Sequence, residues 1–574
     1  MTSIPDAHQK VPMMFRAQVQ GRSQLQYLDP QRKKESNLQD VELWADEWID
    51  KAELIAAEDA EDIQTDTYGA KSYRISWRFV TNGGQDDGMI RPVIGARGIP
   101  FYPGSSMKGA FRQACQVLEA AGEVPQGTCD YYCGSETEVT PGALRFLGAY
   151  PTNDWTEGLL DLVHPQQGWQ VKTVDTQAKP QGESAYAQVS LYQPTLRFAI
   201  SSSKPLPSEQ WQQIWQIWER AIASGLGSKV STGYGQIKQT SYPIIYRVKL
   251  KGQGQASKLI DGTGEFRPSM FRAALRGHAL RIFGGLTEAD NAEQLVEDLF
   301  GGVRGRGEVG LLGLAFRVDK LEQKLFGNNG YEQPTYNVEG EITWLLTQSL
   351  STEQTEVLQK LVSDLMWFAM VFGGFGKSWR RADHRLFYRE ENYEKLIGCH
   401  WQWAGEIDRR NALRVWKPTK VGEFIDSVRE TAKVWMQLRR NINPNPDCHA
   451  DWREAWHPSR VRIFGRIAKT RDDCAAIDWL HEPYQKKISN TDKEKTIKAT
   501  SVTGQINRIG RLWHRMYPPK VRLVAKNSEK PKLEKTDRFL ELLTIFPDGS
   551  QESNDFLEFL NTKPEGFEQL WGDK

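Results

Sequence analysis

Polar and apolar positions along the first half of the chain predict a fixed order of elements. Residues 72–80 alternate polar and apolar side chains, as a half-buried strand does. A helix is predicted from about residue 105 to 121, followed by strands at 144–150 and 188–201. Ser208 begins an amphipathic helix with three Trp on its apolar face. A glycine-rich loop then leads to a short strand at 236–238, and residues 151–186 form an irregular insertion.

The second half repeats this order. We predict strands at 244–250, 309–318 and 336–346, with helices at 269–283 and 352–372. Residues 319–335 are expected to be a second irregular insertion. The order strand, helix, strand, strand, helix, strand is the ferredoxin-like (RRM-like, βαββαβ) plan. The sequence therefore predicts an α+β protein with two tandem domains of this kind and a basic C-terminal region.

One stretch, residues 99–112, has features of a phosphate-binding site and is named the first ledge. A Pro103-Gly104 turn is followed by Ser105 and Ser106, either of which can cap the helix that follows. A helix N-terminus offers free N–H groups and the positive end of the dipole. Lys108 and Arg112 lie four residues apart and hence on one helix face. The alternative is an ordinary capped helix with two solvated cations.

A second version of the stretch, residues 266–276, is named the second ledge. Here Pro268 and Ser269 precede Arg272 and Arg276, again four residues apart. Behind each ledge an apolar helix ends in a glycine-rich loop, at 225–235 and at 373–381. Two ordered pairs of the same elements indicate an internal duplication.

With these motifs the chain resembles the repeat-associated mysterious protein (RAMP) superfamily of CRISPR systems, most closely the backbone subunit of type III effector complexes. The resemblance rests on residues 103–112 and the late glycine-rich loop and covers roughly residues 70–400. The chain looks like a fusion of two backbone subunits, as in III-D-like variant systems built from fused proteins. We expect an N-terminal extension at 1–68 and backbone domains at 69–241 and 242–419. A basic region at 420–574 completes or packs on the second domain, or forms a third small lobe.

The loop 81–98, directly before the first ledge, holds Asp86 and Asp87 among glycines. The resemblance implies that an aspartate of this loop is needed for cleavage of target RNA through attack of a ribose 2′-OH. Asp87 or Asp86 would orient the nucleophile, take its proton, or hold a divalent cation such as Mg²⁺. The alternative is that Asp-Asp-Gly forms only a turn. Asp261, in the short link before the second ledge, is interpreted as a turn residue.

The resemblance also implies that the ledges and glycine loops hold RNA phosphates, and that the two insertions take the place of the family's thumb hairpin. Tyr234 could stack on a base, with core packing as the alternative. The predicted RNA-binding residues are Ser105, Ser106, Lys108, Arg112, Lys229, Tyr234, Arg272, Arg276, Lys377, Ser378, Arg380 and Arg381.

Composition and charge restrict the class of protein further and leave the predicted fold unchanged. The formal net charge is +1, so overall charge does not indicate a polyanion partner, although Arg and Lys become frequent after about residue 437. No apolar run reaches the roughly 20 residues of a membrane helix, and six scattered Cys favour a reduced, cytoplasmic protein. Cys115, Cys129 and Cys133 invite a zinc interpretation, but their pattern is wider than usual and we expect no zinc site there. His514 is assigned to structural packing.

These observations lead to one function and two rivals. The expected function is a double backbone subunit that binds guide CRISPR RNA, assembles with other effector subunits and cuts paired target RNA at one site in its first domain. One rival is a structural RNA-binding subunit without cleavage. The other is a guide-processing endoribonuclease of the same superfamily, which would usually use a His base.

Overall fold

The structure of the protein is a computed structural model. It describes residues 44–46, 48–50, 52, 61–81, 83–86, 89–135, 137, 139–163, 171–172, 186–223, 225–237, 243–259, 262–302, 309–327, 332–376, 382, 384–387, 398–405, 415, 417–486, 494–505, 508–523, 532–535 and 537–573. The chain divides into two compact units. Unit 1 comprises Met1–Pro165, Glu183–Pro243 and Lys258–Thr263, and unit 2 comprises Gln166–Gly182, Ile244–Ser257 and Gly264–Lys574.

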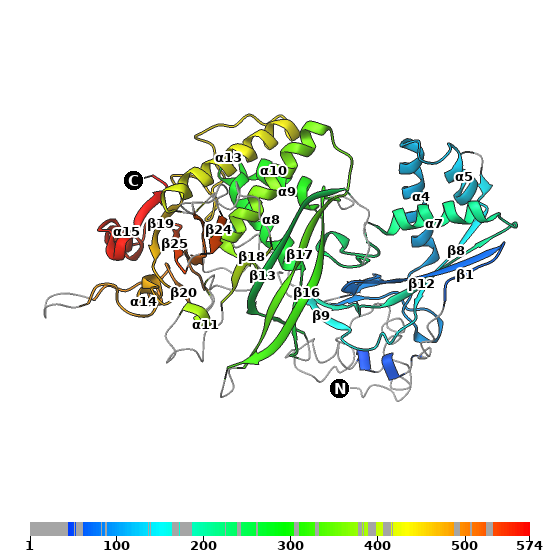
Figure 1. Ribbon diagram of the computed structural model, residues 1–574, viewed down its shortest axis with the longest axis horizontal. Helices are drawn as coiled ribbons and strands as arrows, with labels where there is room; N and C mark the ends of the chain where they lie inside the picture. Colours follow the sequence, from blue (N-terminus) through cyan, green and yellow to red (C-terminus); the bar gives the residue numbers. More distant parts are fainter. Residues whose placement is uncertain are drawn as a thin grey trace, which may run out of the picture. The chain divides into compact units, whose positions relative to one another are not determined.

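Unit 1 is built on an antiparallel four-stranded sheet with the order β1-β2-β12-β8 (Figure 1). Its strands are β1 (Ile63–Gln64), β2 (Tyr68–Arg74), β12 (Thr195–Ser202) and β8 (Leu144–Pro151). Helices α4 (Gly104–Ala120) and α7 (Ser208–Ile222) lie side by side on one face of this sheet. Between them they bury Phe111, Leu118, Trp211 and Trp218. The apolar face predicted for the helix that begins at Ser208 is confirmed, since Trp211, Trp215 and Trp218 are buried.

In the described part of the strand expected at 236–238, which ends at Ile237, the pairing is a single antiparallel bridge between Ile237 and Ile75. The Ser76 N–H donates to the Gln236 carbonyl at 2.7 Å, which continues this contact. The predicted strand 72–80 is divided into β2 and a short β3 (Arg78–Phe79), which pairs with β11 (Leu191–Tyr192). Both changes place the end of the glycine loop against the end of β2.

The insertion after β8 is not irregular throughout. It contributes β9 (Leu160–Val163) and β10 (Tyr186–Val189) to a second sheet of unit 1. The loop that precedes the first ledge adds the hairpin β4 (Gly84–Asp86) and β5 (Met89–Arg91), and β5 runs parallel to β10. Smaller elements of unit 1 are η2 (Ala96–Gly98), α5 (Thr128–Cys133), β6 (Gly134–Ser135), β7 (Thr140–Pro141) and η3 (Val230–Thr232).

Unit 2 contains an antiparallel four-stranded sheet, named the second sheet, with the order β16-β17-β13-β18. Counted along the chain, its strands lie in the order second, third, first, fourth. The strands are β13 (Ile244–Gln255), β16 (Leu312–Phe326), β17 (Gln333–Leu346) and β18 (His400–Trp403). Helices α8 (Ser269–Gly284) and α9 (Ala289–Phe300) precede β16, and α10 (Thr352–Phe368) with the π-helical turn Ala369–Gly373 follows β17.

The insertion predicted at 319–335 is wrong as an irregular segment. Strands β16 and β17 continue as a long hairpin, and their register runs without a break from Lys320–Glu339 to Phe326–Gln333. The far part of the hairpin is exposed and charged, which hid the strand from the sequence pattern. Backbone hydrogen bonds between the two strands hold this part of the hairpin together, because its exposed side chains bury little surface.

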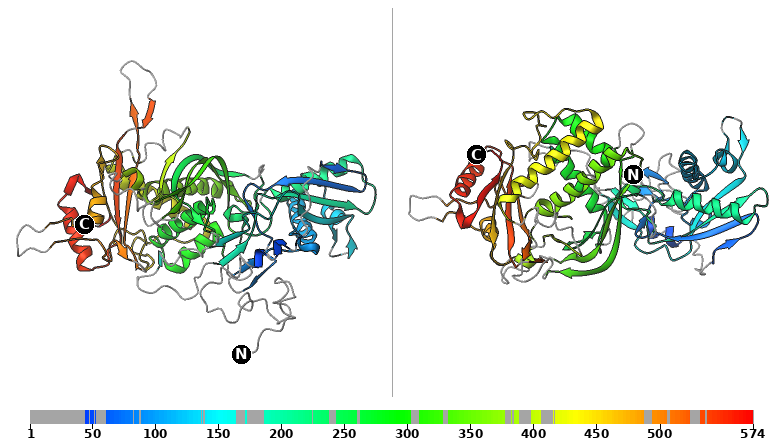
Figure 2. Two further views of the ribbon diagram at one scale, coloured as in Figure 1. Left: turned by 90° about the horizontal axis from the view of Figure 1, so that it is seen from below. Right: turned by 45° about the horizontal axis from the view of Figure 1, so that its top comes forward.

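A further four-stranded antiparallel sheet, named the third sheet, lies in the region that the sequence marks only as basic. Its order is β22-β25-β19-β26, again second, third, first, fourth along the chain. The elements in chain order are β19 (Arg462–Ala468), α14 (Ala475–His481), β22 (Leu512–Tyr517), β25 (Phe539–Ile545), α15 (Gln551–Asn561), η6 (Pro564–Gly566) and β26 (Glu568–Trp571). A hairpin of β23 (Lys520–Leu523) and β24 (Lys532–Lys535) stands out between β22 and β25 (Figure 2). The remaining pieces are β14 (Ser257–Lys258), β15 (Gly264–Glu265), α11 (His384–Phe387), β20 (Gly504–Gln505) and β21 (Arg508–Ile509).

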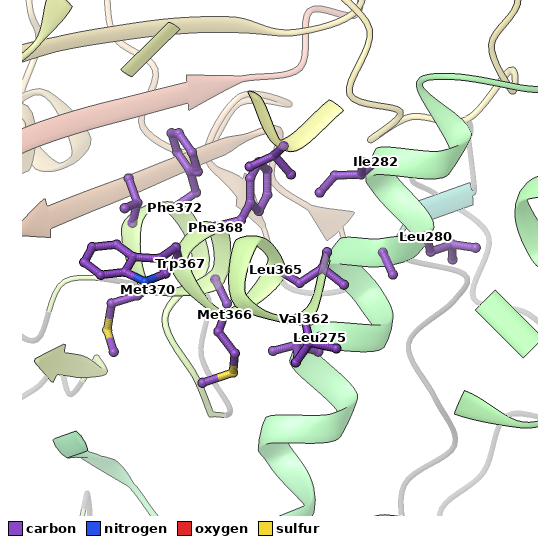
Figure 3. Packing of buried hydrophobic residues seen from close by; sticks show 14 of the residues in the cluster. Leu275, Leu280, Ile282, Val362, Leu365, Met366, Trp367, Phe368, Met370 and Phe372 are labelled. Atoms are coloured by element: carbon purple, nitrogen blue, oxygen red, sulfur yellow. The ribbon is translucent and has the colours of Figure 1, made fainter. Parts of the chain in front are cut away.

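One apolar core joins the second and third sheets. Helix α13 (Thr419–Arg440) packs along α10, and Trp435, Trp456 and Trp513 belong to the same buried cluster as α8 and α10. Figure 3 shows α8 and α10 side chains, including Leu275, Leu365 and Phe368, in mutual contact. In addition, Arg515 of β22 is fully buried and donates to the carbonyl oxygens of Met370 and Trp401. The third sheet is therefore fastened to the second by both packing and hydrogen bonds.

In the described part of the chain, no helix is both long and apolar enough to cross a membrane.

Candidate nucleic-acid interface

The first ledge is pinned to the edge strand of the unit 1 sheet. Tyr102 and Ala149 exchange two backbone hydrogen bonds, of 2.8 and 2.9 Å. Two glycines allow this approach. A Cβ on Gly104 would lie 2.1 Å from the Phe146 carbonyl oxygen, and one on Gly148, whose φ is +81°, would lie 2.2 Å from that of Tyr102. Any larger side chain at either position would push the ledge off the sheet.

Helix α4 begins earlier than the sequence predicts, so the expected cap by Ser105 or Ser106 is wrong. The N-cap residue is Pro103, and no side chain caps the helix. Ser105 and Ser106 instead lie in the first helical turn with exposed side chains. The first intrahelical bond runs from the Met107 N–H to the Pro103 carbonyl, so the N–H groups of residues 104–106 have no partner within the helix. The two hydroxyls and these N–H groups lie in the same turn, at the positive end of the helix dipole.

The two cations of the first ledge are not equivalent. Lys108 is half-buried one turn into α4. Arg112 donates to the carbonyl oxygens of Cys133 and Gly134, at 3.2 and 2.9 Å, and so holds the end of α5. Arg112 therefore stabilises the local structure behind the ledge, and Lys108 is the cation nearer the start of the helix.

Sequence reasoning missed an aromatic pair beside the ledge. The rings of Phe101 and Tyr150 stack with centroids 5.5 Å apart and an interplanar angle of 18°. Tyr150 remains 42% exposed, so part of its ring faces solvent. Phe101 directly precedes the pinned residue Tyr102, and Tyr150 follows Ala149 on β8. The sequence gives no signal for this pair, because the two rings are brought together by the backbone bridge between Tyr102 and Ala149.

The first glycine loop folds back onto β3 and the residue after it. The Ser228 N–H donates to the Val80 carbonyl at 2.8 Å and the Gly235 N–H to the Arg78 carbonyl at 2.7 Å. Lys229 adopts a left-handed backbone conformation, with φ +59°, and is half-buried. Tyr234 is 4% exposed and packs on Trp77 with ring centroids 4.7 Å apart. The structure therefore favours the core-packing alternative for Tyr234 over base stacking.

Of the two predicted catalytic aspartates, only the backbone of Asp86 is described, and it belongs to the hairpin β4–β5. Asp86 is the last residue of β4 and pairs with Met89 of β5. The side chain of Asp86 and the whole of Asp87 lie outside the described part of the protein. What the structure adds is that this segment is paired to strands of the post-β8 insertion, and is not an isolated loop.

The second ledge differs from the first in its cations. Arg272 is 6% exposed and one of its terminal nitrogens donates to the Phe300 carbonyl. Burial, with a smaller effect of Arg276, lowers the pKa of Arg272 to about 10. Arg276 is half-buried and lies within electrostatic reach of Glu293 and Glu297 of α9. In this structure both cations face α9, so they join two helices and are not presented to a ligand.

Most of the second glycine loop falls outside the described residues. This holds for Lys377, Ser378, Arg380 and Arg381, and also for Asp261. The described start of the loop is tightly packed: a Cβ on Gly373 would lie 2.4 Å from the His278 ring nitrogen Nε2. The described part of the loop therefore stays in the core, where Phe375 is 1% exposed and packs on Phe271 and Trp401.

The cysteines considered for zinc lie behind the first ledge. Cys115, Cys129 and Cys133 are buried, and all are free thiols. Burial raises the pKa of Cys115 and of Cys133 to about 12. Cys129 contacts the Arg112 carbonyl through its sulfur at 3.8 Å. These contacts are those of buried packing around α4 and α5.

Comparisons with known proteins add two remote likenesses. No family model matches the chain, and no curated protein matches it. Among solved structures, the chain is similar to the crystal structure of Cmr6 from Pyrococcus furiosus, with 15% identity and a TM-score of 0.19 over 31% of this chain and 100% of that one. It is also similar to a chain in the cryo-EM structure of the Type III-B Cmr-beta complex bound to cognate target RNA, with 9% identity and a TM-score of 0.26 over 52% of this chain and 94% of that one. At these TM-scores neither likeness carries an argument, and the proposals below rest on the chain's own residues.

Proposed function

We propose that the protein is a guide-RNA-binding backbone subunit of an RNA-guided type III CRISPR effector complex. The proposal takes the β1-β2-β12-β8 sheet and the second and third sheets, each with its helices, as ferredoxin-like units. The second and third sheets have the full strand order of that fold, and the unit 1 sheet has it with the fourth strand reduced to the Ile75–Ile237 bridge. Tandem units of this kind would present repeated binding positions along one RNA strand.

The first ledge is the observation that carries the proposal. Exposed Ser105 and Ser106, first-turn N–H groups and Lys108 all lie at one helix start that Gly104 and Gly148 fix against the sheet. Backbone N–H groups, hydroxyls and a cation are the donors that proteins use for phosphate oxygens. The stacked pair Phe101 and Tyr150 adds a ring face for a base. Such contacts read backbone and shape, and leave sequence to base pairing with the guide.

The test measures the binding of guide-length single-stranded RNA to the full-length chain by fluorescence anisotropy, over a series of salt concentrations. Lys108→Ala should weaken binding equally for unrelated sequences. It should also reduce the slope of log affinity against log salt by about 0.7, the value for one lost phosphate contact on a single strand. Lys204→Ala removes the same charge from an exposed position after β12 and serves as the matched control. Equal effects of the two variants would contradict binding at the ledge.

The proposal extends to cleavage of the paired target at the hairpin β4–β5. The ribose 2′-OH would attack the adjacent phosphorus, the bond from phosphorus to the 5′ oxygen would break, and the products would carry a 2′,3′-cyclic phosphate and a 5′-OH. Asp86 or Asp87 would orient the hydroxyl or take its proton. A carboxylate pair is also a suitable donor set for Mg²⁺.

Cleavage is tested in an assembled complex with Asp86→Ala plus Asp87→Ala. The proposal requires the cut assigned to this subunit to disappear while guide and target binding are kept. Unchanged products would leave the structural, non-cleaving subunit as the better account. The guide-processing rival is tested separately, by incubating the isolated protein with repeat RNA and looking for site-specific cutting.

A further inference from the structure

The third sheet contains a polar group inside an otherwise apolar layer. On the face covered by α14, residues such as Ile477, Met516 and Ala468 form a buried cluster. Within the same layer lie Cys474, His514 and Glu541, which are 8%, 6% and 0% exposed. Burying three such groups costs free energy unless each finds a strong partner.

The fold brings these three residues together from different elements. Cys474 is the N-cap residue of α14. His514 pairs with Leu543 and Met516 with Glu541 in the β22–β25 ladder. His514 and Glu541 are therefore diagonal neighbours on one face of the sheet, because side chains two residues apart on a strand share a face. The start of α14 places the Cys474 sulfur above them.

The distances between the three side chains are close to those of a metal coordination shell, with the His514–Glu541 distance slightly shorter. Cys474 Sγ lies 3.6 Å from His514 Nε2 and 3.3 Å from Glu541 Oε1, and His514 Nε2 lies 3.2 Å from the same oxygen. Tetrahedral zinc bonds of about 2.3 Å to sulfur, 2.0–2.1 Å to nitrogen and 2.0–2.2 Å to oxygen place such ligand atoms about 3.3–3.6 Å apart. We propose that Cys474, His514 and Glu541 bind a zinc ion. Among the described residues no fourth side chain joins this group, so a water molecule would complete the tetrahedron.

A network of hydrogen bonds alone accounts for the cluster less well. Glu541 Oε2 accepts from Arg466 Nε at 2.7 Å. Glu541 Oε1 is then approached by three donors, namely the Cys474 thiol, His514 Nε2 and the Ala476 N–H at 2.9 Å. A carboxylate oxygen has about two lone-pair directions, so three donors compete for them. A metal ion removes the competition, because it takes the place of the thiol proton and of the proton on Nε2.

The charges of the cluster also balance with a divalent cation. Arg466 bridges Glu541 and Asp473, with contacts of 2.7 Å to a carboxylate oxygen of each. One guanidinium faces two carboxylates, which leaves one net negative charge when the Cys474 thiol is protonated and the His514 imidazole is neutral. A divalent cation together with a Cys474 thiolate brings the whole set to neutrality. Buried charges that sum to zero are far less costly than an unpaired one.

Such an ion would join the start of α14 to strands β22 and β25. The ligands span 67 residues of sequence, from Cys474 to Glu541, and the segment between them contains the β23–β24 hairpin. Binding to the folded state alone stabilises that state. This role is separate from the RNA-binding proposal, since none of the three residues belongs to unit 1.

The test is the zinc content of untagged full-length protein, measured by inductively coupled plasma mass spectrometry after dialysis into chelator-free buffer. The proposal expects one equivalent of zinc per chain, and its loss in Cys474→Ser and in His514→Asn. Cys129→Ser and Cys448→Ser remove a thiol elsewhere and should keep the metal. Retention of full zinc by Cys474→Ser would overturn the site, as would loss of zinc from Cys129→Ser alone.

A second measurement does not depend on the folding of variants. Wild-type protein stripped of metal and reconstituted with Co²⁺ should show a thiolate-to-cobalt charge-transfer band and the visible bands of a tetrahedral ion. Its melting temperature should fall on metal removal and recover when zinc is returned. Absence of both the cobalt spectrum and the melting shift would overturn the proposal.

Discussion

Gly148 of β8 faces the carbonyl oxygen of Tyr102 so closely that a Cβ on Gly148 would lie 2.2 Å from it. Gly148 also has φ +81°, a conformation that disfavours other residues. The first ledge, which contains Tyr102, is therefore held against the sheet by a glycine distant in sequence. Retention of RNA and local stability should then depend on the same residue.

Gly148→Ala should destabilise unit 1 by at least about 1–3 kcal/mol, the usual cost of a strained backbone position, before the backbone collision is added. Urea unfolding followed by tryptophan fluorescence measures this change. Gly109→Ala is the matched control, since Gly109 lies in the interior of α4 and a Cβ added there would have nothing within 4 Å. It should stabilise the helix by about 0.5–1 kcal/mol. Similar destabilisation by both variants would contradict a specific contact at Gly148.

Substitution of Arg112 should lower the stability of the chain, whereas substitution of Lys108 should weaken RNA binding. Arg112→Ala removes two hydrogen bonds from a charged donor to the end of α5, each worth about 1.5–3 kcal/mol in typical cases. It should lower the melting temperature of the chain, whereas Lys108→Ala should leave that temperature unchanged and weaken RNA binding. Differential scanning fluorimetry beside anisotropy distinguishes the two effects. A Lys108→Ala variant that melts early but binds RNA normally would reverse the assignment.

Tyr150 should contribute to RNA binding through its ring and not through charge. Tyr150→Ala should weaken binding of single-stranded RNA by about 1–3 kcal/mol, the usual value of one base stacked on an aromatic ring. The dependence of affinity on salt should stay as in wild type, because no phosphate contact is lost. Tyr150→Phe should bind normally. If Tyr150→Phe binds as weakly as Tyr150→Ala, the hydroxyl and not the ring makes the contact.

The helices and most strands around the ledge could be predicted because their apolar spacing is regular. Helices α7 and α8 start at the predicted residues Ser208 and Ser269. The faces of the second ledge could not be predicted in this way. Spacing places Arg272 and Arg276 on one side of α8, but it does not say that α9 covers that side. A usable signal is the matching pair Glu293 and Glu297, also four residues apart on the next helix.

The third sheet was hidden for a different reason. Its strands carry charged residues that are buried with partners, such as Arg466 with Glu541 and Arg515 with two carbonyl oxygens. A hydrophobicity pattern counts such residues as exposed, so β19 and β22 read as part of a basic region. The apolar run of β25 is the one signal of this sheet that the sequence offers. The partners come from strands far apart in sequence, which no local window contains.

His400 of β18 should make the stability of unit 2 depend on acid pH. Burial, together with Arg515 and Lys251 nearby, lowers the pKa of His400 well below its ordinary value. The folded protein then keeps the imidazole neutral, whereas the unfolded chain takes up a proton below about pH 6.5. The free energy of unfolding should therefore fall as the pH drops below 6.5, by up to about 1.4 kcal/mol per pH unit.

The measurement is the thermal midpoint of wild type and of His400→Gln between pH 5 and 7, a window set by that ordinary His pKa of about 6.5. The variant should lose less stability than wild type over this window, because an amide cannot take up the proton. Parallel curves for the two proteins would show that His400 does not contribute to the pH dependence.

The most direct test of the RNA-binding account is to locate the guide on the protein. Full-length chain is bound to single-stranded guide RNA that carries photoreactive uridines, irradiated, digested and analysed by mass spectrometry. The account predicts cross-links to Tyr150 and to the peptide with Phe101, Ser105 and Ser106, and their loss in Gly148→Ala. Cross-links confined to peptides outside the first ledge and β8, with none at these residues, would contradict it.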